Sequence, residues 1–168
     1  MHDMSKGMEW GFPGDKVGMI ENNTMRTVAT ANIRSFKAID EYEFELELTS
    51  DLPEEIGVGA ALENLTWTPD VDIRNSFFGS CRARGLLVST PGKVVIENNV
   101  FESSGSAILI AGDANYWYES GAVKDVLIKG NDFRYPCMSS MYQFCEAIIS
   151  IEPEIPQPDT KYPFHSNI

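Results

Sequence analysis

The sequence predicts an all-β protein: a right-handed parallel β-helix of about three coils, truncated, after a small N-terminal antiparallel β-barrel subdomain. Two observations predict this. A strand-like phrase occurs three times, as IRNSFF (73–78), IENNVF (96–101) and IKGNDF (128–133), and a second apolar phrase follows each copy. The first third of the chain lacks this repeat. The expected units are a β-barrel or sandwich at 1–64, β-helix coils at 65–151, and a Pro-rich loop with the start of a further coil at 152–168.

The barrel is expected from short strands separated by glycine turns. Phe44, Leu46 and Leu48 alternate with Glu45 and Glu47, which is typical of a half-exposed antiparallel strand. FPGDKVGMIE and EEIGVGAALE each place a glycine turn before a short strand, and MRTVATANIRSF has strand character. Together these segments predict five or so strands.

The coils are expected because 23 residues separate Phe78 from Phe101, an interval that suits one turn of a parallel β-helix. Equivalent residues of successive coils would stack about 4.8 Å apart, the spacing of neighbouring strands. The alternative is an antiparallel sandwich in which the similarity is coincidental. The repeat predicts an interior aromatic column and a polar ladder at the bend: Phe78, Phe101 and Phe133, and Ser76, Asn99 and Asn131.

The second interval, from Phe101 to Phe133, is 32 residues, so nine residues are inserted into this coil. They fall within DANYWYESGAVKD (113–125), after an apolar strand phrase. A repeat fold accepts insertions only in its loops, and such loops usually carry the function. The insertion is therefore the first place to search for a binding site.

Loops after the second strand of each coil should emerge on one side, which brings carboxylates together beside exposed aromatic rings. Glycosidases use paired carboxylates, aromatic faces stack on sugars, and arginine binds hydroxyl or acidic groups. The predicted catalytic residues are Asp113 and Glu119, and the predicted substrate-binding residues are Arg84, Tyr116, Trp117, Glu152, Glu154 and His165.

Structural alternatives exist for several of these residues. Asp113 could instead cap its loop, Glu119 could hold the turn before Ser120, and Trp117 could cover the flank of the solenoid. Arg82 and Arg84 alternate along a strand, so only one can face inward, and Arg84 is assigned to the site while Arg82 is expected in solvent.

Composition excludes some partners. There are 13 basic and 25 acidic residues, a net charge of −12, which argues against binding to nucleic acid or an anionic membrane surface. No apolar run approaches the roughly 20 residues of a membrane span, and the N-terminus lacks signal-peptide features. The cysteines are expected as free thiols, with a Cys137–Cys145 clip as the alternative in an oxidising compartment. No motif indicates a metal or a cofactor.

Four segments, ENLTWTPDVDIRNSFF, RARGLLVSTPGKVVIENNVF, SAILIAGDANYWYESGAVKDVLIKGNDF and ISIEPE with FHSNI, resemble the exo-acting α-1,3-galactosidases of glycoside hydrolase family 110. That family removes terminal galactose from blood-group-B-type glycans. The resemblance implies a right-handed β-helix, inverting hydrolysis without a cofactor, a galactose-terminated glycan as partner, and a periplasmic or secreted parent protein.

The sequence departs from that family in one respect. Family members carry a paired-aspartate motif in a coil before the barrel, and this chain has neither the pair nor the coil. The chain is therefore expected to hold part of a site and to be inactive alone, with self-association through exposed β-helix ends. The alternatives are a non-catalytic carbohydrate-binding or structural β-helix module and, with weaker support, a polysaccharide lyase or epimerase.

Overall fold

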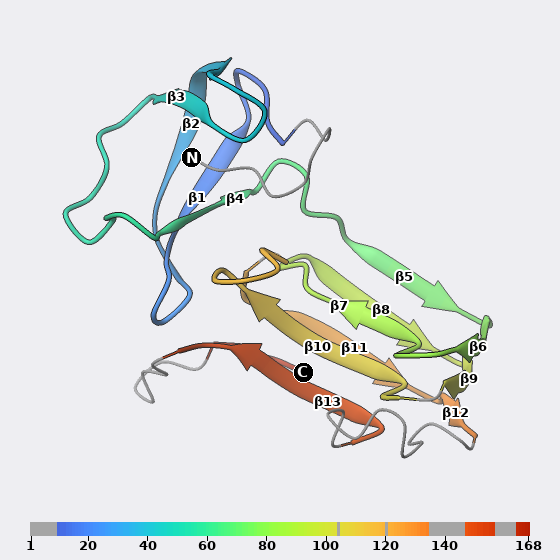
Figure 1. The fold of residues 1–168 in the computed structure, drawn as a ribbon. Helices are drawn as coiled ribbons and strands as arrows, with labels where there is room; N and C mark the ends of the chain where they lie inside the picture. The colour runs from blue at the N-terminus through green and yellow to red at the C-terminus, as the bar shows by residue number, and fades with distance from the viewer. Residues whose placement is uncertain (1–9, 104, 120, 135–146, 157–163) are drawn as a thin grey trace.

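The computed structural model describes residues 10–103, 105–119, 121–134, 147–156 and 164–168. The regular elements in these ranges are all β-strands, and the described residues contain no helix that could cross a membrane. The first four strands form one antiparallel sheet in the order β3-β2-β1-β4 (Figure 1). They are β1 (Lys16–Glu21), β2 (Arg26–Ala38), β3 (Phe44–Leu48) and β4 (Ala61–Asn64).

This sheet follows the polarity of its sequence. In β3 the side chains of Phe44, Leu46 and Leu48 are half-buried while Glu45 and Glu47 are exposed, so the predicted alternation is confirmed. The central strand β1, which pairs with β2 on one edge and β4 on the other, is instead buried over four consecutive residues. Four strands are described here, one fewer than the approximate number expected.

The second part consists of three parallel sheets, each with three strands. Successive stretches of the chain each contribute one strand to each sheet (Figure 1). The register matches the repeat, because Ile73 and Ile128 both pair with Ile96. The strands are β5 (Val71–Arg74), β6 (Phe77–Cys81) and β7 (Leu86–Val88), then β8 (Lys93–Glu97), β9 (Val100–Ser103) and β10 (Ile108–Asp113), then β11 (Asp125–Lys129), β12 (Asp132–Phe133) and β13 (Ile149–Glu154).

The predicted aromatic column is present. The rings of Phe78 and Phe101 stack with centroids 5.0 Å apart, and those of Phe101 and Phe133 with centroids 5.4 Å apart. Phe101 lies in the middle of the column and is fully buried. The aromatic side chains therefore join three successive repeats through one continuous core.

The predicted polar ladder is also present. The side-chain oxygen of Asn99 accepts the Ser76 N–H at 2.9 Å, and that of Asn131 accepts the Asn99 N–H at 2.9 Å. Each amide group also donates to a strand carbonyl of the preceding repeat, Asn99 to Ile73 and Asn131 to Ile96. The ladder thus satisfies backbone groups at a bend where the strand ladder is interrupted.

The two parts of the chain are in contact. Ile20 and Met25 of the antiparallel part pack with Ala114, the second residue of the predicted insertion, against Ile155 and Phe164. This contact places the antiparallel sheet next to the inserted loop. Cys81 is a free thiol, and Cys137 and Cys145 lie outside the described residues.

The final described residues run beside β11. The Val126 N–H donates to the Asn167 carbonyl at 3.0 Å, and the Asn167 side chain donates to Asp125 at 3.0 Å. Asn167 therefore lies next to the first residues of β11.

Candidate functional site

The inserted loop starts at the C-terminal end of β10, where Asp113 is only 3% exposed. Its carboxylate accepts the N–H of Asn115 at 2.7 Å and that of Tyr116 at 3.0 Å, and a third bond comes from the Trp117 N–H. These bonds match the loop-capping alternative for Asp113. Both carboxylate oxygens are used by the turn that they close.

The aromatic side chains of the loop are exposed, as the sequence predicted. Tyr116 is 70% and Trp117 is 69% exposed, and their rings meet edge to face with centroids 4.8 Å apart. Tyr118 is also exposed, and its φ of 56° lies in the left-handed region that disfavours a bulky residue. The Tyr116 and Trp117 rings therefore project into solvent from a tightly bent backbone instead of packing on the parallel strands.

The loop is bonded to the antiparallel sheet as well. The Gly121 N–H donates to Glu63 Oε1 of β4 at 3.0 Å, and the Asn115 side chain donates to the Asn22 carbonyl at 3.2 Å. A Cβ atom at Gly121 would lie 2.6 Å from the Glu63 carboxylate, so glycine permits this approach. Sequence reasoning missed Glu63, because nothing in its own strand pattern indicates a partner 58 residues away.

The backbones of three of the predicted acidic residues lie near one another. Asp113 and Glu154 are register partners in β10 and β13, and the Asp113 N–H donates to the Glu119 carbonyl at 3.3 Å. Glu152 is two residues back along β13 and pairs with Ala111. Glu119 is half-buried, and its carboxylate has no hydrogen-bond partner among the described residues.

Arg84 lies at the opposite end of the same sheet. It precedes β7, and its neighbour Gly85 bonds to the Ser106 carbonyl, whereas Asp113 ends β10. At about 3.3 Å per residue, the strand separates these two ends by about 20 Å. Arg82 is exposed and Arg84 half-buried, but residues 82–84 form a bend between β6 and β7, so the strand alternation expected for them is wrong, and the structure does not bring Arg84 to the loop.

His165 is packed against the chain that follows the loop. Its Nδ1 accepts the Val123 N–H at 3.0 Å, and its Nε2 is buried without a partner in the described part of the chain. Burial lowers the pKa of His165 to about 4, so the ring is neutral near pH 7. This environment is that of a structural histidine, which holds the segment around Phe164 in place.

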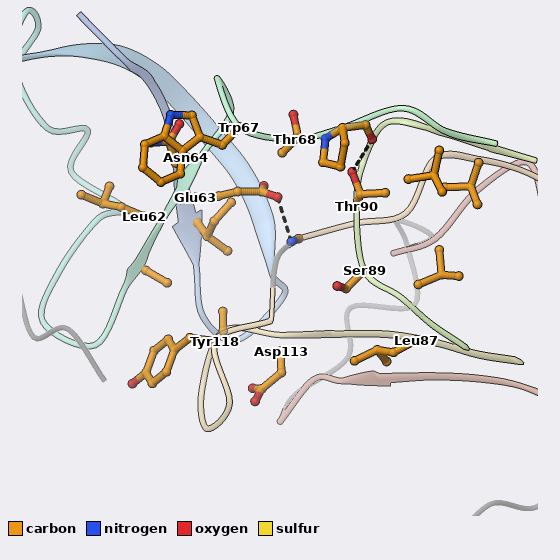
Figure 2. Close-up of a pocket in the computed structure, with 18 of the residues that line it drawn as sticks. Leu62, Glu63, Asn64, Trp67, Thr68, Leu87, Ser89, Thr90, Asp113 and Tyr118 are labelled. Atoms are coloured by element: carbon orange, nitrogen blue, oxygen red, sulfur yellow. Dashed lines mark hydrogen bonds between the residues drawn. The ribbon is translucent and has the colours of Figure 1, made fainter. Parts of the chain in front are cut away.

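A cleft of about 460 Å³ lies between the antiparallel sheet and the first repeat (Figure 2). In Figure 2, Glu63 and Trp67 border one side of it and Asp113 and Tyr118 the other. Much of the lining is apolar and comes from β5, β7 and β8. Of the predicted catalytic and substrate-binding residues, only Asp113 lines this cleft. Among the described residues, no group of three or more His, Cys, Asp or Glu side chains could hold a metal ion.

The fold and the loop together define an all-β protein. Its antiparallel, barrel-type subdomain packs against repeated parallel strands, which carry an insertion rich in aromatic and acidic residues. A family profile described as GLAA-B beta-barrel domain II matches residues 1–62, which agrees with the expected barrel subdomain.

Curated relatives match the chain along its whole length. Alpha-1,3-galactosidase B of Bacteroides thetaiotaomicron is 70% identical over 168 residues, all of this chain and 27% of that protein. Alpha-1,3-galactosidase B of Parabacteroides distasonis is 44% identical over all of this chain and 29% of that protein. Alpha-1,3-galactosidase A of Bacteroides fragilis strain YCH46 is 44% identical over all of the chain and 28% of its own length. The resemblance predicted from the sequence is confirmed, and the chain spans about a quarter of these relatives.

Proposed function

We propose that this chain is part of a glycoside hydrolase that removes terminal α-linked galactose from glycans. The observation that carries the proposal is the 70% identity, over every residue of the chain, to a protein named alpha-1,3-galactosidase B. The expected chemistry is hydrolysis with inversion, and the expected location of the parent protein is the periplasm or the cell exterior.

The proposed framework is a right-handed parallel β-helix. Parallel strands in matching register and the stacked phenylalanine rings support it. β5, β6 and β7 each occupy the outer position of their sheets. Their free edges, and the apolar cleft residues Val71, Leu86 and Val88, suit a further coil stacked on the first repeat. In the chain by itself, the same edges would favour self-association.

The proposed glycan site is the loop face around Trp117. An exposed indole provides an apolar face for the C–H side of a pyranose ring, and Glu119 carries a carboxylate with no described hydrogen-bond partner. Glu154 ends the neighbouring strand and would bind sugar hydroxyl groups. A neutral glycan also suits a chain with a net charge of −12, which would repel nucleic acid.

Inversion needs two carboxylates about 6.5–9.5 Å apart, with room for a water molecule between the sugar and the base. We propose that this chain supplies one of them and that a coil outside it supplies the other. The chain alone would then bind a galactoside without hydrolysing it.

The test is calorimetric titration of the chain with galactose and with α-1,3-galactobiose. We expect Trp117→Ala to weaken binding by about tenfold, the loss expected for one aromatic stacking contact. Trp67→Ala removes an aromatic side chain from the cleft and serves as the matched control, which should bind as the unmodified chain does. Equal binding by Trp117→Ala and the unmodified chain would exclude the loop as the glycan site.

The alternative is a carbohydrate-binding module without catalysis, which the use of both Asp113 carboxylate oxygens by the turn favours. A chain extended by the upstream segment of such a relative separates the two functions. Release of galactose by the extended chain supports the hydrolase, and tight binding without release supports the binding module.

A further inference from the structure

Asp113, which was predicted from the sequence as a catalytic residue, caps the first turn of the inserted loop. Its carboxylate is buried, and its two oxygens accept backbone N–H groups of Asn115, Tyr116 and Trp117. Both oxygens of this carboxylate are therefore engaged in closing the turn. Its hydrogen bonds fix the backbone from which the Trp117 ring projects.

A second carboxylate holds the other end of the loop. Glu63 belongs to β4 of the antiparallel sheet, and its Oε1 accepts the Gly121 N–H at 3.0 Å, the bond drawn as a dashed line from Glu63 in Figure 2. The Asn115 side chain donates to the Asn22 carbonyl, in the turn between β1 and β2, at 3.2 Å. The loop is thus held from both sides by groups outside its exposed tip.

Glu119 lies between these two anchors and differs from both. It is half-buried, its carboxylate has no hydrogen-bond partner among the described residues, and only its carbonyl bonds to the Asp113 N–H. We infer that Asp113 and Glu63 are positioning residues, which preset the loop so that Trp117 and Glu119 meet the glycan. This inference rests on the proposed function, and it assigns the antiparallel sheet a role in shaping the glycan site.

The physical advantage is pre-organisation. A loop that is already ordered loses little conformational freedom when the sugar binds, so more of the contact energy appears as affinity. An exposed indole on a disordered loop would lose that advantage. Substitutions of Asp113 or Glu63 should therefore change the glycan affinity only through their effect on the loop.

Amide hydrogen exchange tests the anchors without any ligand. In Asp113→Asn we expect the amides of residues 115–117 to exchange about tenfold to a hundredfold faster, the effect of losing hydrogen bonds to a charged acceptor. In Glu63→Gln the Gly121 amide should exchange faster, while the amides of residues 115–117 stay unchanged. Glu119→Gln is the matched control and should leave all four amides unchanged. Unchanged exchange in both anchor variants would overturn the inference, and Glu63→Gln decides alone if Asp113→Asn does not fold.

A double-mutant cycle then tests the link to the glycan. Asp113→Asn should weaken α-1,3-galactobiose binding several-fold in the unmodified chain and have a smaller effect in Trp117→Ala, because the part of its influence that passes through the indole is then absent. Fully additive losses would refute positioning through Trp117. If the unmodified chain binds no galactoside, the proposed function fails, while the exchange rates still decide whether the two carboxylates fix the loop.

Discussion

Replacing Phe101 by alanine tests whether the stacked phenylalanine rings hold the repeats together. The side chain is fully buried and lies between the rings of Phe78 and Phe133. A phenylalanine buries about 150–250 Å², and at about 25 cal/mol per Å² this stabilises the fold by roughly 4–6 kcal/mol. Alanine retains a small part of that area but leaves a cavity between two rings. We therefore expect a loss of about 3–5 kcal/mol in the free energy of unfolding.

Urea unfolding followed by circular dichroism measures this loss. Phe77→Ala is the matched control, because Phe77 lies in the corresponding segment of the first repeat but is 62% exposed. It should change the free energy of unfolding by no more than about 0.5 kcal/mol. Phe101→Leu keeps most of the volume and gives a measurable, smaller loss if the alanine variant does not fold. If Phe101→Ala costs no more than Phe77→Ala, the column is not a source of stability.

Two further predictions concern other packed positions. Gly85→Ala should destabilise the chain by about 1–3 kcal/mol in the same urea assay, since its Cβ would lie 2.6 Å from the Ala107 carbonyl oxygen. Gly57→Ala is the control, because its Cβ would meet open space, and it should leave the free energy of unfolding nearly unchanged. Burial lowers the pKa of His165 from its ordinary value of 6.5 to about 4, so the side chain is neutral in the folded chain. Below pH 6.5 the unfolded chain therefore binds more protons than the folded chain. Stability is then fully present above pH 6.5 and falls as the pH drops toward 4. His165→Asn should flatten that part of a pH series of urea midpoints, and an unchanged slope would contradict the assignment.

Local repetition in the sequence predicted much of the parallel region. Ile73, Ile96 and Ile128 align in the phrase and also in the sheet, because residues at equivalent places in successive repeats become neighbours across parallel strands. Asn99 and Asn131 were predicted as a ladder for the same reason, and their hydrogen bonds have that form. The exposed aromatic loop followed from the interruption of the repeat.

The site was less predictable. Arg84 was assigned to the site from alternation along a strand, but residues 82–84 form a bend between β6 and β7, at the opposite end of the sheet from the loop. Asp113 was predicted as a catalytic residue because it carries a carboxylate, whereas its capping role depends on how the backbone turns back after β10. Neither the end of a strand nor the path of a turn is contained in the spacing of residue types.

The sequence by itself determined the repeating arrangement of strands, since side chains that stack in successive layers require similar residue types to recur along the chain. The tertiary structure alone decided that Glu63 of the antiparallel sheet meets Gly121 of the insertion, and that a cleft lies between the two parts. Such contacts join segments with no shared period, so they arise only when two separately formed surfaces pack against each other.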